Sequence, residues 1–294
     1  MASSLRKYQT NPKTLLETAI NFYRSKKIKT AIVEGACDRR FIQQWCKPDA
    51  AVRFDGFDGK SLVEQAYLGS QTGAFSKHDF LYFFSDVDYD IISGKKITHH
   101  PRYINNAYCT EKQQIEYNDL EIFLVNTIAL EKLLSNQDIN PSEANSIRNK
   151  LEQASREVGS FRAADITLSK KLGLGRSILN GLEPGTFFNC KSISIDRASM
   201  IEQMPRWSNY PRYIDDLVDE AEALDKSHAA KWALSRGHDV TELLSLHLED
   251  RGSRGLTRER VELMLRLACE LSDYKNSTMG KQLLADGAEN CFLI

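Results

Sequence analysis

Short apolar runs alternate with amphipathic helical segments over residues 12–90, and this alternation constrains the fold more than any other feature of the chain. The apolar runs are rich in β-branched and aromatic residues and are short enough to be buried strands. Strands that alternate with helices predict an α/β fold, in which a parallel sheet is flanked by helices. The predicted strands cover residues 30–35, 52–57 and 80–84, and the predicted helices cover residues 12–23, 37–45 and 59–68.

The pattern changes after residue 119, where helical spacing of apolar residues dominates. We therefore predict a mostly helical insertion in the sheet domain. The expected divisions are residues 1–119 for the first part of the core, 120–190 for the insertion, and 191–294 for the remainder of the core and the C-terminal helices. Further helices are predicted at residues 119–134, 142–158, 163–172, 212–224, 240–248 and 257–271, and residues 192–196 are a strand candidate.

Composition narrows the class of protein only moderately. Apolar residues make up 41% of the chain and charged residues 27%, which is typical of a globular protein. The formal net charge is -1, so any surface that binds nucleic acid must be local. The six cysteines form no C-x-x-C pair, which predicts free thiols. The N-terminus is polar and no long apolar run is present, so we predict a cytoplasmic protein that does not enter a membrane.

Three carboxylates directly follow two of the predicted strands. Glu34 follows the first strand, and Asp86 and Asp88 follow the third. The carboxyl ends of parallel strands form the ligand-binding edge of such a sheet, where converging carboxylates repel one another unless they share a cation. The two-residue spacing places Asp86 and Asp88 on one side of an extended segment. We therefore expect these three residues to bind a metal, with Asp38 acting from behind Glu34; the alternative is an acidic turn or helix cap.

Two later segments also carry candidate site residues. Arg236 or His238 could contact phosphate while Asp239 adds a carboxylate to the acidic group, or Asp239 could simply cap the following helix. In the Asn-Asp-Leu-Glu segment at residues 118–121, helix capping is the simpler interpretation, and a metal-binding or base role for Glu121 is the other.

A basic loop at residues 94–103 follows the acidic pair. Lys95, Lys96 and Arg102 could grip a phosphate backbone beside the metal, or the loop could simply be solvated. The Gly-rich segment at residues 173–177 lacks the Gly-Lys-Ser/Thr ending of a phosphate loop, and the chain has no G-x-S-x-G motif. These two absences argue against a P-loop nucleotidase and a serine hydrolase.

Residues 32–38, together with residues 85–88, resemble the Toprim fold of topoisomerases, primases and overcoming-lysogenization-defect nucleases. Residues 118–121 and 237–239 are similar to the DUF4435 branch of Toprim-like proteins, which includes the AriB-like effector nucleases of the PARIS anti-phage system. The resemblance implies that Glu34, Asp86 and Asp88 bind Mg²⁺ or Mn²⁺, and that metal-activated water cleaves a phosphodiester.

The resemblance also implies partners. In this branch an ABC-type, AriA-like ATPase holds the effector inactive until it senses a phage protein, and the released effector forms a homodimer that cleaves tRNA and stops translation. A basic residue beside the acidic group is implied as well, and Lys95, Lys96, Lys231 and Arg236 all remain candidates. The alternatives are a DNA-cleaving or nicking Toprim nuclease and a non-catalytic regulatory subunit. A topoisomerase would need a catalytic tyrosine domain, for which the sequence gives no sign.

Overall fold

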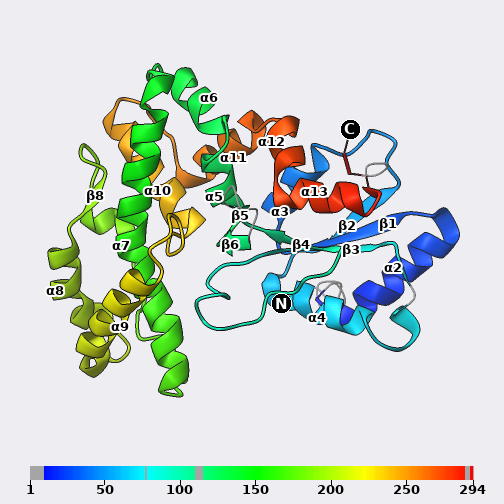
Figure 1. Ribbon diagram of the computed structural model, residues 1–294, viewed down its shortest axis with the longest axis horizontal. Helices are drawn as coiled ribbons and strands as arrows, with labels where there is room; N and C mark the ends of the chain where they lie inside the picture. The colour runs from blue at the N-terminus through cyan, green and yellow to red at the C-terminus, as the bar shows by residue number, and fades with distance from the viewer. Residues whose placement is uncertain (1–9, 77, 110–114, 289–291, 294) are drawn as a thin grey trace. The chain divides into compact units, whose positions relative to one another are not determined.

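The computed structural model describes residues 10–76, 78–109, 115–288 and 292–293. The chain is α/β and 57% helical. It divides into two compact units (Figure 1). The sheet unit comprises Met1–Asp86, Thr98–Asn106 and Leu271–Ile294, and the helical unit comprises Val87–Ile97 and Ala107–Glu270.

The sheet unit is built on a four-stranded parallel sheet, as the sequence predicts. Its strand order is β2-β1-β3-β4, and every neighbouring pair is parallel. Such strands are covered on both faces, which explains their continuous apolar sequences. The strands are β1 (Lys29–Val33), β2 (Val52–Gly56), β3 (Leu81–Asp86) and β4 (Tyr103–Asn106).

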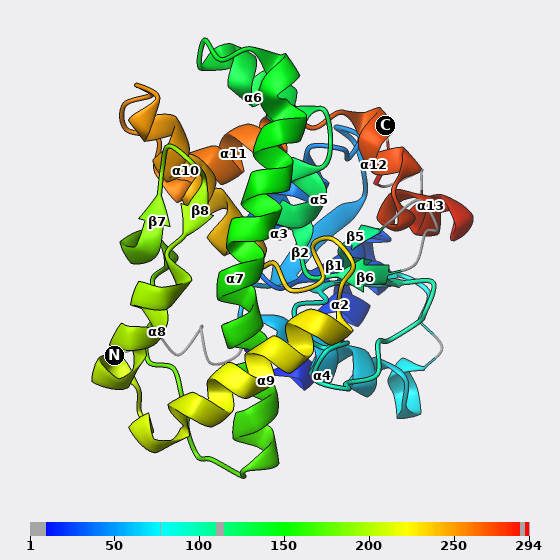
Figure 2. The same ribbon diagram turned by 60° about the vertical axis from the view of Figure 1, so that its left-hand side comes forward.

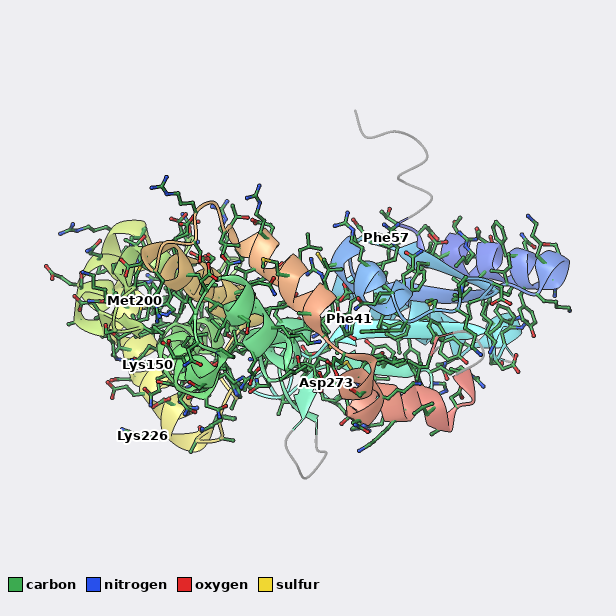
Figure 3. All side chains as sticks on the ribbon, turned by 90° about the horizontal axis from the view of Figure 1, so that it is seen from above. Phe41, Phe57, Lys150, Met200, Lys226 and Asp273 are labelled. Atoms are coloured by element: carbon green, nitrogen blue, oxygen red, sulfur yellow. The ribbon has the colours of Figure 1, made fainter. Side chains whose placement is uncertain are left out.

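Helices cover the two faces of this sheet (Figure 1). α2 (Pro12–Lys26) begins where the sequence predicts, because the Asn11 side chain accepts a hydrogen bond of 3.1 Å from the backbone N of Thr14. α2 packs against α4 (Lys60–Ser70) on one face. α3 (Ala36–Gln43), α12 (Leu271–Asn276) and α13 (Thr278–Ala285) lie on the other face, and Phe41 of α3 is buried there (Figure 3).

The helical unit is organised around one long helix, α7 (Ala144–Lys171). α9 (Ile214–Ser227) crosses α7 (Figure 2), and their apolar faces share one core with Met200 of α8. Met200 is fully buried, whereas Lys226 of α9 lies at the surface (Figure 3). The remaining elements are α5 (Leu120–Val125), α6 (Ala129–Asn136), α8 (Arg197–Trp207), α10 (Gly237–Asp250), α11 (Arg258–Ala268), the pair β5 (Tyr108–Cys109) and β6 (Ile115–Tyr117), and the pair β7 (Phe188–Asn189) and β8 (Ser194–Ile195).

Helix boundaries differ from the prediction in two places. The helices expected at residues 142–158 and 163–172 are both parts of α7, which runs without a break through Gly159. A Cβ at that position would lie 1.7 Å from the backbone O of Leu234, so the glycine serves a close approach rather than a helix end. The helix expected at residues 119–134 is divided into α5 and α6.

The domain boundaries also differ from the prediction. The helical unit begins before residue 120 and continues to residue 270, so residues 191–270 do not return to the core of the sheet unit as expected. The strand candidate at residues 192–196 becomes β8, which pairs with β7 inside the helical unit. The physical reason is that the apolar residues of α8 and α9 pack on α7. Within residues 191–294, it is Leu271–Ile294 that returns to the sheet unit.

Four of the six cysteines have side chains within the described part of the chain. Cys37, Cys46, Cys190 and Cys269 form no disulfide, whereas the Cys109 side chain and Cys291 lie outside the described part of the chain. None of the helices in that part is long and apolar enough to cross a membrane.

Candidate functional sites: an acidic strand edge and a charged cavity

The first candidate site lies at the carboxyl edge of the parallel sheet. Glu34 directly follows β1, and Asp86 is the last residue of β3. Oε1 of Glu34 accepts hydrogen bonds from the backbone N of Asp86 (2.8 Å) and from Oγ of Ser85 (2.6 Å). The Glu34 carboxylate is thus held against the backbone at the end of β3, where Asp86 stands.

Asp38 fixes the local structure behind Glu34. It lies in the first turn of α3 and is 8% exposed. Its Oδ2 accepts a hydrogen bond of 2.9 Å from the backbone N of Gly35, and its Oδ1 accepts one of 3.2 Å from Nδ2 of Asn106. Asp38 therefore holds the turn that follows Glu34 and orients the Asn106 amide.

Asn106 is a site residue that the sequence analysis missed. It ends β4 and is in register with Asp86 of the neighbouring strand. Its side chain is 1% exposed, and its Oδ1 has no hydrogen-bond donor among the described residues. The signal in the sequence was weak, because β4 has only four residues and follows a polar loop.

The atoms at this edge fit a hard divalent cation. Glu34 and Asp86 offer carboxylate oxygens and Asn106 offers an amide oxygen, which are the ligands that Mg²⁺ and Mn²⁺ prefer. A buried polar oxygen without a donor costs about 1–3 kcal/mol. A bound cation would offset that cost at Asn106 Oδ1.

Asp88 does not follow the geometry that was predicted for it. The extended conformation of β3 ends at Asp86, and Asp88 has a positive φ of 49°. Its backbone N donates a hydrogen bond of 2.6 Å to the backbone O of Asn118, within the helical unit. The alternation argument for Asp86 and Asp88 is therefore wrong. Asp88 belongs to the helical unit, where it lines the cavity described below.

The second candidate site is a cavity of about 790 Å³ inside the helical unit. Four of the predicted site residues line it, namely Asp88, Arg236, His238 and Asp239. The last three belong to the start of α10, and Asp88 belongs to the segment that follows β3. The cavity thus unites residues that are about 150 positions apart in the chain.

His238 is held by a buried carboxylate on α11. Its Nδ1 lies 2.9 Å from Oε1 of Glu262, which also accepts a hydrogen bond of 3.1 Å from Oγ1 of Thr241. The hydrogen bond to Glu262 raises the pKa of His238 to about 9, although burial opposes this shift. Burial alone would raise the pKa of Glu262, but the hydrogen bond and positive charge of His238 lower it overall. The pair is therefore charged near neutral pH.

Glu121 joins this pair rather than the acidic strand edge. Glu121, His238 and Glu262 each offer a ligand atom within 4.8 Å of the others, a spacing that could hold a metal ion. Nη1 of Arg266, however, lies 3.8 Å from Oε1 of Glu121 and 3.8 Å from Oε2 of Glu262. Because Arg266 and protonated His238 already supply positive charge, we interpret this group as a charge-balanced cluster.

Asp119 caps α5, as the simpler interpretation of residues 118–121 expected, and it also contacts α10. Its Oδ1 accepts a hydrogen bond of 3.1 Å from the backbone N of Ile122, and its Oδ2 accepts one of 2.7 Å from the backbone N of Gly237. A Cβ on Gly237 would lie 2.1 Å from Oδ1 of Asp119. Burial raises the pKa of Asp119 to about 6.

Asp239 does not cap α10, so the capping interpretation of this residue is wrong. The N-cap position belongs to Arg236, and Asp239 is the third residue of the helix. Asp239 is only 2% exposed. Its carboxylate accepts two hydrogen bonds from Arg162, of 2.7 and 2.9 Å. This paired geometry balances the charge of Asp239 inside the cavity wall.

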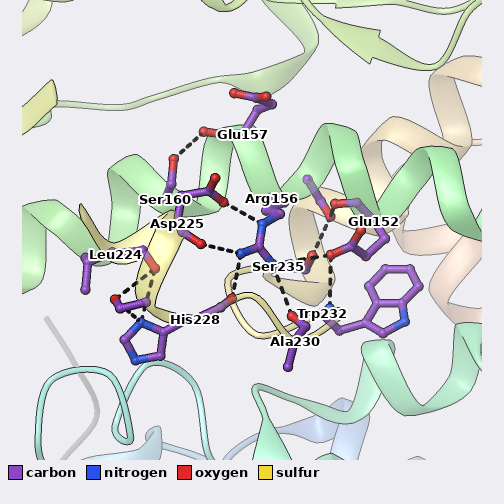
Figure 4. Close-up of polar contacts among 12 residues, drawn as sticks. Glu152, Arg156, Glu157, Ser160, Leu224, Asp225, His228, Ala230, Trp232 and Ser235 are labelled. Atoms are coloured by element: carbon purple, nitrogen blue, oxygen red, sulfur yellow. Dashed lines mark hydrogen bonds and ion pairs between the residues drawn. The ribbon is translucent and has the colours of Figure 1, made fainter. Parts of the chain in front are cut away.

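The loop that leads into α10 is fixed along one face of α7 (Figure 4). Glu152 accepts a hydrogen bond of 3.1 Å from the backbone N of Trp232, and Ser155 and Ser235 share one of 2.7 Å. Arg156 donates a hydrogen bond of 3.1 Å to the backbone O of Ala230. Residues three and four apart share a helix face, so one stripe of α7 positions the loop and, through it, Arg236 and His238.

The predicted basic residues are dispersed. Lys95 is exposed and pairs with Asp90 at 3.2 Å, and Lys96 is exposed on the same loop. Lys231 donates a hydrogen bond to Asn149. Arg102 precedes β4, so it lies at the amino edge of the sheet, where its Nε is 3.1 Å from Oδ2 of Asp286. The expectation that Arg102 grips phosphate beside Glu34 and Asp86 is therefore wrong, because parallel strands place their two ends at opposite edges.

The fold and these two sites define an α/β protein with an acidic strand edge and a separate helical unit that contains a charged cavity. Neither a protein-family model nor a curated protein matches the chain.

Proposed function

We propose that the protein is a Toprim-like, metal-dependent nuclease whose metal is bound at the carboxyl edge of the parallel sheet. The observation that carries this proposal is the pairing of Glu34 with Asp86 through the hydrogen bond from the Asp86 backbone N to Oε1 of Glu34. Two acidic residues follow or end neighbouring parallel strands, at the edge where open parallel sheets bind their ligands.

The residues of this edge have separate roles in the proposal. Glu34 and Asp86 hold Mg²⁺ or Mn²⁺, and Asn106 offers its amide oxygen. Ser85 holds the Glu34 carboxylate in place, and Asp38 orients Asn106. When bound, such an ion activates water and neutralises the charge that develops on the scissile phosphate.

We further propose that the substrate is RNA, with tRNA as the first candidate, and that the protein is an anti-phage effector. In this proposal an ABC-type ATPase holds it inactive and the released form is a homodimer. The support is the resemblance of residues 118–121 and 237–239 to the DUF4435 branch. These two segments contact each other, since Asp119 accepts a hydrogen bond from the backbone N of Gly237.

The first test is cleavage of total tRNA by the purified protein with Mg²⁺, with Mn²⁺ or with EDTA, beside the Glu34→Gln variant. We expect discrete fragments that need metal, and a loss of about 100-fold or more in Glu34→Gln, because the variant loses a charged metal ligand. Asp286→Asn is the matched control, since Asp286 is a hydrogen-bonded carboxylate of the same unit that contacts Tyr82 and Arg102 instead.

Direct Mn²⁺ binding, measured by calorimetry, separates a failure of catalysis from a failure of the site. Equal metal-dependent cleavage by the wild type and Glu34→Gln would refute the proposed metal site. Cleavage of plasmid DNA but not of RNA would support the DNA-cleaving alternative. Absence of both cleavage and Mn²⁺ binding would favour a non-catalytic subunit.

A further inference from the structure

The cavity of the helical unit is lined by an arginine that stands at the amino end of α10. Arg236 lines the cavity at the N-cap position of α10 and does not cap the helix with its side chain. Among the described residues, its guanidinium has neither a hydrogen-bond acceptor nor an ion-pair partner. Arg162, by contrast, lines the same cavity but is occupied by Asp239.

A second cation lies two residues further along the helix. His238 lines the cavity and its side chain is 45% exposed. Its Nδ1 faces Glu262, so that the other ring nitrogen remains for a ligand. Both residues belong to the amino end of a 14-residue helix, which carries a partial positive charge.

At least three of the six acidic residues that line the cavity are engaged by other groups. Asp239 binds Arg162, and Asp90 pairs with Lys95. Asp165 accepts hydrogen bonds from the backbone N of Ile178 (2.6 Å) and of Leu179 (3.2 Å). These contacts reduce the repulsion that an anion would meet beside Arg236.

The remainder of the cavity suits the organic part of a ligand. Apolar side chains of Ile166, Leu179, Leu182 and Pro184 line it together with the polar residues. Its volume of about 790 Å³ falls within the range of about 300–1,000 Å³ that is typical of small-molecule sites. An apolar wall beside a cationic one is the combination that a nucleotide requires, since it has a flat base and a charged phosphate.

We propose that this cavity binds a nucleotide, with Arg236 and His238 contacting the phosphate and the apolar wall contacting the base. The nucleotide is either a free nucleoside phosphate or one unit of a nucleic-acid strand, since the two share this chemistry. The site is independent of the metal site proposed at the sheet edge, because its residues all belong to the helical unit.

The test is calorimetric titration of the full-length protein with adenosine monophosphate in the presence of EDTA, which removes divalent metals. We expect saturable binding of adenosine monophosphate. The affinity for adenosine should be at least about tenfold weaker, because adenosine lacks the phosphate. Arg236→Gln should weaken binding by about tenfold or more, and Arg236→Lys should restore part of the affinity. Arg254→Gln is the matched control, since Arg254 is an exposed arginine beyond the other end of α10.

Two further measurements test whether the variant folds and which kind of nucleotide the cavity binds. Thermal unfolding of Arg236→Gln should match the wild type, because no described ion pair is lost. A short single-stranded oligoribonucleotide that binds more tightly than the mononucleotide, and loses that affinity in Arg236→Gln, would assign the site to a strand. Mononucleotide binding that is at least as tight would assign it to a free nucleotide.

Two results would overturn the proposal: equal affinity for adenosine monophosphate and adenosine, or equal affinity of wild type and Arg236→Gln for both probes. Undetectable binding of both probes at millimolar concentration would overturn it as well. Glu34→Gln should bind the mononucleotide like the wild type in EDTA. A variant that loses cleavage but still binds the nucleotide is therefore defective at the sheet edge alone. A variant that loses nucleotide binding but still cleaves is defective at the cavity alone.

Discussion

Gly159 allows a close approach between two segments of the helical unit. It lies in the middle of α7, where the backbone O of Leu234 would lie 1.7 Å from an added Cβ. The hydroxyl of Tyr89 also donates a hydrogen bond of 3.1 Å to the Leu234 carbonyl. A glycine in a helix interior is unfavourable by about 1 kcal/mol relative to alanine. The close approach of the Leu234 loop outweighs this cost.

Gly159→Ala should therefore destabilise the protein, although alanine is the better helix former. We expect a loss of about 2–3 kcal/mol in the free energy of unfolding, since the loop must move away from α7. Urea unfolding measures this change. Gly175→Ala is the control, because no described atom lies within 4 Å of its added methyl group, and it should change stability by no more than about 0.5 kcal/mol. A neutral Gly159→Ala would contradict the close approach.

His238 gives the protein a pH-dependent contribution to stability. The hydrogen bond to Glu262 raises the pKa of His238 to about 9 from its ordinary value of 6.5. Because the folded state holds this proton more tightly than the unfolded state, the contribution is fully present below pH 6.5 and is lost as pH rises through 9. The imidazole is 45% exposed, so solvent screens part of the effect.

The wild type should therefore lose a few degrees of melting temperature between about pH 6.5 and 9.5 that His238→Gln does not lose. Other groups titrate in this window in both proteins, so the difference between the two curves is the relevant quantity. Melting curves recorded by circular dichroism at several pH values provide it. Parallel curves for wild type and variant would mean that Glu262 does not hold the proton on His238.

At the scale of elements, the sequence predicted what depends on local pattern. Continuous apolar runs predicted β1, β2 and β3, and Asn11 followed by Pro12 predicted the start of α2. The carboxylates at strand ends could be placed at one edge because parallel strands share their direction. Long-range contacts could not be predicted in this way, because no periodicity encodes them.

Three residues illustrate which structural features could not be predicted from the sequence. Asn106 belongs to a strand of four residues, which is too short for alternation to distinguish from a loop. The continuity of α7 through Gly159 depends on a loop 75 residues away, at Leu234. Glu262 looks like one of several carboxylates on α11, and only the packing of α11 beside α10 brings it to His238.

At the scale of the whole molecule, the C-terminal segment completes the core of the sheet unit. Phe292 is fully buried. Its ring centroid lies 5.0 Å from that of Tyr82, 5.8 Å from that of Phe84 and 6.5 Å from that of Phe54. The sheet unit is thus built from segments that are distant in the sequence, with most of the helical unit encoded between them.

Phe292→Ala should lower the free energy of unfolding by about 3–5 kcal/mol, because it removes a buried ring and leaves a cavity. Chemical denaturation gives the value. Leu267→Ala is the control, since Leu267 is 69% exposed and its truncation should have little effect. Similar stability of the two variants would show that the C-terminal segment does not pack on the sheet.

The hydrogen bond between Asp119 and Gly237 limits which residues homologous proteins can have at these two positions. An added Cβ at position 237 would meet Asp119 Oδ1 at 2.1 Å and the Cβ of Glu121 at 2.5 Å, so a larger residue there requires a change in the other segment. In homologous proteins that keep this contact, the residues at positions 119 and 237 should therefore co-vary. A homologue with a side chain at position 237 should have replaced the aspartate at position 119, and an alignment deep enough to contain such exchanges would record the contact without any structure.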